Sequence, residues 1–266
     1  MERDQLPFEL TPERVRRICA AHFGCHSDGV LLLSSPSDPR FVASLRIFNP
    51  DGSEAELSGN GAREAVLYLR RHGWTDADEF SIETAAGEIR PTITSERTCS
   101  LAIGRARLRS PDYPSGGEDG RGTLVADGRE FAFQHVQIGN PQCVIAVGEE
   151  VEALDLARIG PDIEGSELFP NRTNVSFIDV GPAGRVRARI FERGVGETLS
   201  SGTGACGAAV AAVLRGSASP VTVVLDGGEL DVAVSDDLDV TLTGWAEPVF
   251  SGELADEVVR SLEEVS

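Results

Sequence analysis

The sequence predicts a mixed α/β fold (α+β) made of two similar halves, each with mostly antiparallel strands around one central helix. The first observation is a repeat, in which a glutamate stands four residues before a serine that begins Ser-Gly-x-Gly-Ala. The two copies are Glu54 with Ser58 and Glu197 with Ser201. The second is the Ala/Val/Leu-rich stretch after each copy, which indicates a buried helix. The third is the series of short apolar runs between Gly, Pro and Asp turns, which is typical of strands.

The first half begins with a capped helix. Thr11 and Pro12 provide an N-cap and a first helical position, and apolar residues follow at helical spacing over 15–21. Residues 29–34 are a continuous apolar run and residues 41–48 alternate between apolar and polar, so both are predicted strands. We also expect a turn at 49–52, a helix over 60–72, and strands over 80–84, 88–94 and 99–103.

The second half follows residues 110–122, which are rich in Pro, Gly and charge, have no periodicity and are predicted to be a loop or linker. We then expect strands within 123–147 (131–138 and 144–147), a short helix over 154–159, strands over 174–180 and 186–191, a helix over 203–215, strands over 221–225, 229–234 and 239–243, and a terminal helix over 255–265. The predicted halves are residues 1–104, joined by 250–266, and residues 105–249.

Composition excludes several partners. Hydrophobic residues make up 41% and charged residues 25%, which is ordinary for a globular protein. The net charge of −19 argues against a nucleic-acid partner, because phosphate binding needs clusters of basic residues. No stretch reaches the roughly 20 apolar residues of a membrane span, and residues 1–6 show no signal-peptide core. We therefore expect a cytoplasmic protein without a membrane partner.

The basic and sulfur-containing residues argue against several cofactors. All 24 Lys and Arg positions are arginine, so the chain lacks the lysine of a pyridoxal-phosphate Schiff base and of a P-loop. The five cysteines are odd in number with no CxxC spacing, and the four histidines form no HExxH motif. These patterns give little support to a disulfide framework or a zinc site. We expect no cofactor and no metal.

The two repeat motifs are also the best candidate site. Backbone N–H groups at the start of a glycine-rich helix can bind anions. The candidates are Ser58, Gly59 and Asn60 at one helix start and Ser201, Gly202 and Thr203 at the other. Polar residues in apolar surroundings add Asn140, Gln142, Asn174, Glu192 and Arg193. One such loop is often only an N-cap, but two in register favour a functional interpretation.

Several motifs taken together make the chain resemble the diaminopimelate epimerase family. They are Asn49-Pro-Asp-Gly-Ser-Glu54, Gly59-Asn-Gly-Ala-Arg63, Gly139-Asn-Pro141, Asn171-Arg-Thr-Asn174, Glu192-Arg-Gly-Val-Gly-Glu-Thr198 and Gly202-Thr-Gly-Ala205. Their order and spacing match the family from about residue 9 to about residue 250. The resemblance implies two pseudo-twofold-related, barrel-like halves, each around a central helix, and suggests a homodimer. It also implies cofactor-free inversion at an amino-acid α-carbon, from L,L- to meso-diaminopimelate, on the route to lysine and peptidoglycan.

The chain departs from the family at the catalytic positions. The resemblance places the two catalytic cysteines, which act as base and acid on opposite faces, at Ser58 and Ser201. The histidine partner of the first falls on Gln142, and the glutamate partner of the second is kept as Glu192. The substrate-binding positions match at Asn49, Gly59, Asn60, Asn140, Asn174, Glu192, Arg193, Gly202 and Thr203. The family's N-terminal strand, with its Gly-Asn-Asp-Phe signature, is expected to be missing.

These departures matter for proton transfer. A thiol has a pKa near 8.5, whereas a serine hydroxyl is weaker by roughly five units, which adds on the order of 7 kcal/mol to the formation of the anion. Serine needs a neighbouring base, and an amide such as that of Gln142 cannot serve. Glu192 can act on Ser201 or directly on the substrate, which would give one-sided chemistry. Arg193 can hold a distal carboxylate, or form a structural salt bridge with Glu192 or another acid.

The sequence leaves more than one function open. The first is a diaminopimelate epimerase-like isomerase that works slowly or with altered groups. The second is a catalytically impaired homologue that binds an amino-acid-like ligand or partners an active subunit. Laboratory replacement of the cysteines is disfavoured by Gln142, and a serine hydrolase by the absence of a Gly-x-Ser-x-Gly motif. We expect the hydroxyls of Ser58 and Ser201 to face one another across one cleft.

Overall fold

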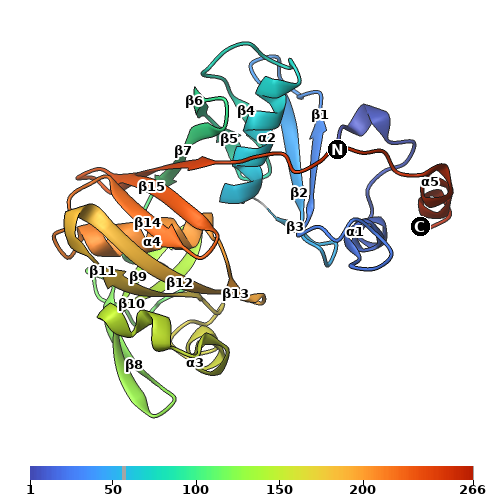
Figure 1. Ribbon diagram of the computed structural model, residues 1–266. Helices are drawn as coiled ribbons and strands as arrows, with labels where there is room; N and C mark the ends of the chain where they lie inside the picture. The colour runs from blue at the N-terminus through green and yellow to red at the C-terminus, as the bar shows by residue number, and fades with distance from the viewer. Residues whose placement is uncertain (56–57, 266) are drawn as a thin grey trace. The chain divides into compact units, whose positions relative to one another are not determined.

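The computed structural model describes residues 1–55 and 58–265, and the chain forms two compact units (Figure 1). Unit 1 is Met1–Cys99 together with Trp245–Ser266, and unit 2 is Ser100–Gly244. The chain passes from one unit to the other within strands β7 (Thr98–Arg105) and β16 (Asp239–Trp245). The predicted halves, 1–104 with 250–266 and 105–249, stay a prediction.

Unit 1 combines a small sheet with three α-helices in the described residues. The sheet has the order β1-β2-β4-β5, with β3 paired to β2. The elements are η1 (Arg3–Gln5), α1 (Pro12–Cys19), β1 (Val30–Ser34), β2 (Ala43–Phe48), β3 (Glu54–Ala55), α2 (Gly59–Arg71), β4 (Ile82–Thr84), β5 (Gly87–Ile89), β6 (Pro91–Ser95) and α5 (Asp256–Glu263). Helix α1 begins as predicted, because the Thr11 side chain accepts a hydrogen bond from the Arg14 N–H at 3.4 Å.

Unit 2 is a larger sheet with two α-helices in the described residues. The strand order of this sheet is β6-β7-β16-β15-β14-β12-β11-β10-β9-β8, with β13 paired to β12. The elements not yet given are β8 (Arg121–Ala126), β9 (Arg129–Ile138), β10 (Asn140–Ala146), η2 (Gly148–Ala153), α3 (Leu156–Glu164), β11 (Asn174–Val180), η3 (Pro182–Gly184), β12 (Arg185–Glu192), β13 (Gly196–Thr198), α4 (Gly202–Val213), β14 (Val221–Leu225) and β15 (Gly228–Val234).

The same strand pattern occurs in both units. In unit 1, β2 pairs antiparallel with β1 and β3 and parallel with β4, which pairs antiparallel with β5. In unit 2, β12 pairs in the same way with β11, β13 and β14, and β14 with β15. The register is also shared, since Phe48 lies opposite Glu54 and Phe191 lies opposite Glu197. The sequence repeat is therefore also a repeat of topology.

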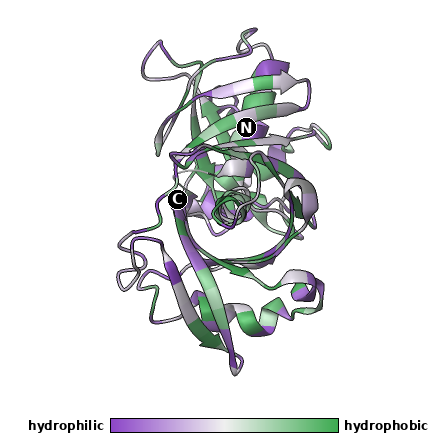
Figure 2. Cartoon of the chain, turned by 90° about the vertical axis from the view of Figure 1, so that its left-hand side faces the viewer, coloured by the Kyte–Doolittle hydropathy of each residue, from purple (hydrophilic) through white to green (hydrophobic). Residues whose placement is uncertain are grey.

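Helix α4 is the centre of unit 2. It contacts strands β9, β10, β11, β12, β14 and β15, and Figure 2 shows these strands curved around a central helix. Its residues are almost all Gly, Ala, Val and Cys, and they are buried on every side. A helix that is apolar all round is a core helix. The predicted arrangement of strands around one helix is confirmed here.

The observed elements differ from the predicted ones mainly where short elements occur. The two-residue β3 and the three-residue β13 were not predicted, because so few residues show no periodicity. The predicted strand 88–94 is two strands, β5 and β6, separated before Pro91, which has no N–H to continue a ladder. Helix α3 continues through Pro161 to Glu164, beyond the predicted end at 159. A proline inside a helix is normally a reason to end it.

A buried histidine lies on the face of the unit 2 sheet opposite α4. His135 is fully buried among aromatic side chains, including those of Tyr113 and Phe169. Its Nε2 lies 2.9 Å from Ser110 Oγ, and its Nδ1 has no partner among the described residues. Burial lowers the pKa of His135 to about 4, because the charged imidazolium loses its hydration.

We expect acid to destabilise the protein through His135. Its folded pKa of about 4 lies below the unfolded value of 6.5, so the stabilisation is present above pH 6.5 and is lost as the pH falls through the window from 6.5 to 4. At pH 5 the loss is about 2 kcal/mol of unfolding free energy relative to neutral pH. Urea unfolding of the native chain and of His135→Phe at pH 7.5 and pH 5 measures it. An equal pH dependence in both proteins would contradict the assignment.

Candidate functional site

Both motif serines are helix N-caps. Ser58 Oγ accepts a hydrogen bond from the Gly61 N–H at 3.2 Å, and Ser201 Oγ accepts one from the Gly204 N–H at 3.2 Å. Each hydroxyl thus uses a lone pair on its own helix and keeps its proton for donation to another group. The amides of the first helical residues have no acceptor within their own helix, which is the arrangement that binds anions.

A glycine lies three residues after each N-cap serine and packs closely against a neighbouring side chain. A Cβ at Gly61 would lie 2.8 Å from Leu31 Cδ2, and one at Gly204 would lie 2.5 Å from Ile190 Cδ1. Both distances are shorter than normal contacts, so the Ser-Gly-x-Gly pattern is explained in part by packing. The motif therefore has a structural role in each unit as well as a candidate binding role.

The repeated glutamates are structural. Glu54 forms a two-point ion pair with Arg46, with both oxygens at 2.8 Å, and Glu197 pairs with Arg189 at 2.5 Å. The Arg46 side chain lowers the pKa of Glu54. Each pair joins a long strand to the short strand before the motif helix, in the same register in both units. These carboxylates fix the loop and are not candidates for the base.

Unit 2 brings together the predicted residues of strands β10 and β11. Gln142 is fully buried, and its Nε2 donates to Asn140 Oδ1 at 2.5 Å, while its Oε1 has no partner among the described residues. Gln142 lies opposite Asn174 in the parallel pair. It also packs against α4, where a Cβ at Gly207 would lie 2.9 Å from Gln142 Cγ. Gln142 therefore lies against the helix that Ser201 caps.

Asn174 holds the backbone before the second motif. It is 5% exposed, and its Nδ2 donates to the Pro141 carbonyl at 3.1 Å. Its Oδ1 accepts from the Arg193 N–H at 2.8 Å. The carboxamide thus joins β10 to the end of β12, and it positions Arg193 through the main chain.

The Arg193 guanidinium has no acidic partner among residues 1–55 and 58–265. Its Nη1 donates to the Asn171 carbonyl at 2.9 Å, and the residue is exposed. The described ion pairs do not include it, whereas Arg172 and Arg189 are both paired with glutamates. The structural salt bridge considered for Arg193 is therefore not formed with a described residue. The cation remains available for an anionic ligand.

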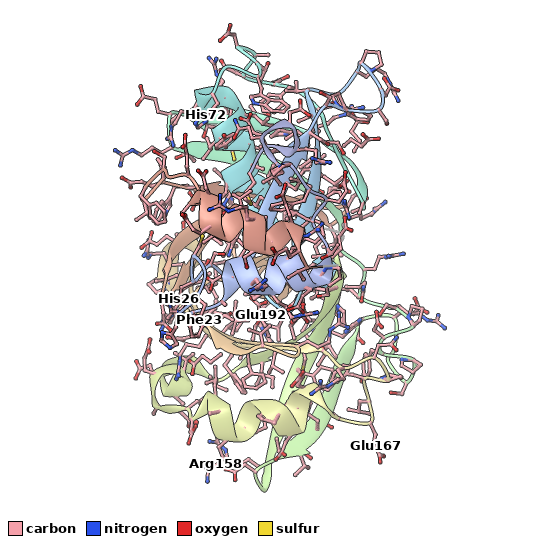
Figure 3. All side chains as sticks on the ribbon, turned by 90° about the vertical axis from the view of Figure 1, so that its right-hand side faces the viewer. Phe23, His26, His72, Arg158, Glu167 and Glu192 are labelled. Atoms are coloured by element: carbon pink, nitrogen blue, oxygen red, sulfur yellow. The ribbon has the colours of Figure 1, made fainter. Side chains whose placement is uncertain are left out.

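Glu192 is the last residue of β12 and is half-buried. Its Oε1 accepts from Thr198 Oγ1 at 3.1 Å, across the pair that β12 makes with β13. Figure 3 shows Glu192 on the sheet side of α3, whereas Arg158 on that helix points away from the sheet. The carboxylate has one hydroxyl donor and no described ion pair, so it is the candidate base in unit 2.

Unit 1 holds its predicted residues with local contacts. Asn49 Nδ2 donates to Ser53 Oγ at 3.0 Å in the turn before β3, and the residue is exposed. Asn60 Oδ1 accepts from Arg63 Nη2 at 2.8 Å, and Arg63 Nη1 donates to the Gly59 carbonyl at 3.0 Å. Arg63 is 5% exposed and supports the first helical turn. The sequence placed Arg63 in a motif without giving it this role.

The sequence also provides no indication of the residues that support Arg193 and its turn. Asn171 was noticed only as part of a motif, and its backbone carbonyl, rather than its side chain, contacts the guanidinium. Glu164 was not noticed, although it accepts from the Gly194 N–H at 2.7 Å. Glu164 comes after Pro161, where the predicted helix had already ended, so no sequence signal directed attention to it.

Three of the five cysteines are fully buried. Cys143 and Cys206 are fully buried in cores of unit 2, and Cys99 is fully buried in unit 1. Burial raises the pKa of Cys143 well above its usual range and the pKa of Cys99 to about 11. These two side chains remain thiols at neutral pH and are poor proton acceptors.

The described part of the chain contains no group of three or more His, Cys, Asp or Glu side chains arranged to hold a metal ion. No α-helix within residues 1–55 and 58–265 has the length and apolar character needed to cross a membrane.

Comparison with solved structures defines the class of fold. A hydroxyproline epimerase from Agrobacterium vitis matches with a TM-score of 0.62 at 18% identity, covering 88% of this chain and 77% of that one. A phenazine biosynthesis protein from Clostridium difficile matches with a TM-score of 0.66 at 13% identity, covering 94% and 90%. A methylitaconate-delta-isomerase matches with a TM-score of 0.60 at 12% identity, covering 95% and 90%. The chain thus has the two-unit α/β fold of these proteins.

Comparison of sequences identifies the family. The sequence profile described as diaminopimelate epimerase matches residues 2–108 and 134–249. A diaminopimelate epimerase from Pelotomaculum thermopropionicum is 42% identical over 246 residues, covering 89% of this chain and 86% of the relative. One from Desulfitobacterium hafniense is 40% identical over 263 residues, covering 95% and 92%. The chain belongs to the diaminopimelate epimerase family, and the predicted resemblance is confirmed.

Proposed function

We propose that this protein binds diaminopimelate and epimerises its α-carbon between the L,L and meso forms, without a cofactor. The observation that carries the proposal is the Arg193 cation, which the backbone holds in place and which has no described acidic partner. It lies one residue after the end of β12, in the chain segment that leads to the helix start at Gly202 and Thr203. A cation and a helix N-terminus suit a ligand with two carboxylates.

The proposed binding mode uses both carboxylates of the substrate. The α-carboxylate takes the amides at the start of α4, and Arg193 takes the distal carboxylate. Asn140 and Asn174 present carboxamides from β10 and β11, and Asn49, Gly59 and Asn60 stay predicted substrate-binding residues of unit 1. An amino-acid substrate agrees with the family, while a homodimer and a cytoplasmic location stay predictions.

The proposed chemistry is slow proton transfer without thiols. A base removes the α-hydrogen and leaves a carbanion, and an acid returns a proton to the opposite face. Glu192 is the proposed base, acting directly or through Ser201, and Ser58 is the proposed proton donor. A neutral hydroxyl is a poor acid, and the Gln142 amide cannot take a proton at neutral pH. The rate is therefore expected to be far below that of a thiol pair.

One observation favours a second candidate function, a homologue that binds the ligand without turnover. Both serine hydroxyls accept N-cap hydrogen bonds, and Gln142 is packed as a buried amide with Asn140. This arrangement serves folding and ligand binding without any titratable group. Such a protein would hold an amino-acid-like ligand or act beside an active subunit.

Deuterium exchange distinguishes the two functions. We expect the native protein in heavy water to incorporate deuterium at the α-carbon of L,L- and meso-diaminopimelate, measured by NMR or mass spectrometry. Glu192→Gln removes the proposed base and is expected to abolish the exchange, with binding measured separately by calorimetry. If the native protein binds diaminopimelate but catalyses no exchange, the epimerase proposal is wrong and the second function, ligand binding without turnover, is supported.

A further inference from the structure

A buried carboxylate lies behind the turn that carries Arg193. Glu164 is the last residue of α3 and is 4% exposed. Its Oε1 accepts from the Gly194 N–H at 2.7 Å, and its Oε2 lies 3.0 Å from Arg172 Nη2. A buried carboxylate is costly unless its oxygens are satisfied, and here each oxygen has a partner. Neither the repeat nor the family motifs assign a role to this residue.

Two successive backbone N–H groups of the turn are held by side chains. The Arg193 N–H donates to Asn174 Oδ1 at 2.8 Å, and the next N–H, from Gly194, donates to Glu164. The turn closes with the Val195 N–H donating to the Glu192 carbonyl at 3.0 Å. Gly194 has a φ of +75°, a conformation that glycine adopts without strain. The orientation of the Arg193 peptide is thus set by two acceptors outside the turn.

Glu164 also holds the segment that supplies the other contacts of Arg193. Its backbone carbonyl accepts from the Thr173 N–H at 3.2 Å, and its carboxylate pairs with Arg172. Arg172 has a φ of +61°, which costs about 1–2 kcal/mol for a residue with a side chain and needs local support. The neighbours of Arg172 provide the Asn171 carbonyl and the Asn174 carboxamide that contact Arg193. One glutamate therefore joins both segments that hold this arginine.

We propose that Glu164 is a positioning residue for ligand binding, which orients the Arg193 guanidinium by holding the Gly194 N–H and Arg172 together. The inference rests on the proposed function, because it takes Arg193 as the group that binds the distal carboxylate. Glu164 itself does not touch the ligand. Its effect is preorganisation, since a guanidinium that is already oriented loses less conformational freedom on binding.

Three substitutions of Glu164 separate the effect of side-chain length from the effect of charge. Glu164→Ala removes the acceptor of Gly194 and the partner of Arg172. Glu164→Asp keeps the charge but shortens the side chain by one carbon. Glu164→Gln keeps the length and an acceptor oxygen for Gly194. Glu167→Ala is the matched control, because Glu167 lies three residues on, is exposed and is labelled on the outer surface in Figure 3.

The test has two readouts on the full chain. The first is amide hydrogen exchange of Gly194 by NMR, which needs no ligand. The second is the Kd of meso-diaminopimelate by calorimetry. We expect Glu164→Ala and Glu164→Asp to exchange the Gly194 amide at least about tenfold faster and to bind about tenfold more weakly. We expect Glu164→Gln, which keeps an acceptor for Gly194 but turns an NH2 group toward Arg172, to lie between the native protein and Glu164→Ala in both, and Glu167→Ala to stay within about threefold of the native protein.

The outcomes separate the inference from the proposed function. Native protein that binds, with Glu164→Ala and Glu164→Asp binding equally well, would overturn the positioning role and leave the function intact. Faster exchange at Gly194 with unchanged Kd would make Glu164 a purely structural residue. Native protein that does not bind would overturn the proposed function and the inference together. If Glu164→Ala does not fold, Glu164→Asp against Glu164→Gln decides the question.

Discussion

The triple variant Ser58→Cys, Gln142→His and Ser201→Cys is expected to exchange the α-proton of diaminopimelate about 10²–10⁴-fold faster than the native protein. A cysteine with a pKa near 8.5 supplies some thiolate at neutral pH, and a helix N-terminus lowers that pKa further. Both serines occupy helix N-caps, so new thiols would benefit from this effect. Histidine at position 142 would add a titratable base in place of a buried amide.

The measurement is the initial rate of deuterium incorporation for the triple variant, for Ser58→Cys with Ser201→Cys, and for Gln142→His alone. The matched control is Ser58→Ala with Ser201→Ala, which also weakens both N-caps, at about 1 kcal/mol each, without adding thiols. We expect a gain only in the proteins that contain both thiols, and the largest gain in the triple variant. A rate equal to that of the native protein, in a folded triple variant that binds ligand, would show that these positions do not carry the chemistry.

Replacing Arg193 by leucine is expected to weaken the binding of diaminopimelate by about 10–100-fold. A charge-assisted hydrogen bond contributes about 1.5–3 kcal/mol. Arg193 is not ion-paired with any described acidic residue, so its replacement leaves no carboxylate unpaired. The expected cost to folding is small, because the side chain is exposed and its described hydrogen bond is to a single backbone carbonyl. The loss should therefore appear in Kd and not in the unfolding midpoint.

Calorimetry with L,L- and meso-diaminopimelate measures this effect beside two controls. Arg193→Lys keeps the charge without the planar two-point geometry and should lie between the native protein and the leucine variant. Arg215→Leu removes an exposed arginine that follows α4 and should leave the Kd unchanged. Unchanged affinity in Arg193→Leu would remove Arg193 from the site and with it the proposed binding mode.

The sequence predicted much of the fold because its strongest signals are local. The Ser-Gly-x-Gly motif marks a helix start through its N-cap serine, and both helices begin immediately after the predicted serine. Strand β11 and strand β14 have the predicted limits, since segments rich in β-branched and aromatic residues and bounded by turns are typical of strands. Elements of two or three residues, such as β3 and β13, are held by pairing to a neighbouring strand and have no pattern of their own.

The sequence predicted the candidate site only in part, because the residues that hold the site residues in place are distant from them in the chain. The motif residues Asn174 and Arg193 were found by type, but the bond from the Arg193 N–H to Asn174 Oδ1 joins positions 19 residues apart. Glu164 binds the N–H of Gly194, which is 30 residues away in the chain. This contact depends on how α3 packs against the sheet, which residue spacing does not predict. The repeated glutamates were noticed only as part of the repeat, and the structure shows that they form ion pairs with Arg46 and Arg189.

The central claim is that diaminopimelate binds to the unit 2 residues around the start of α4 and Arg193. A crystal structure of the protein with L,L-diaminopimelate tests it most directly. The account predicts one carboxylate on the amides of Gly202 and Thr203 and the other on Arg193. A ligand bound elsewhere, or one with neither carboxylate on Arg193, would contradict the claim.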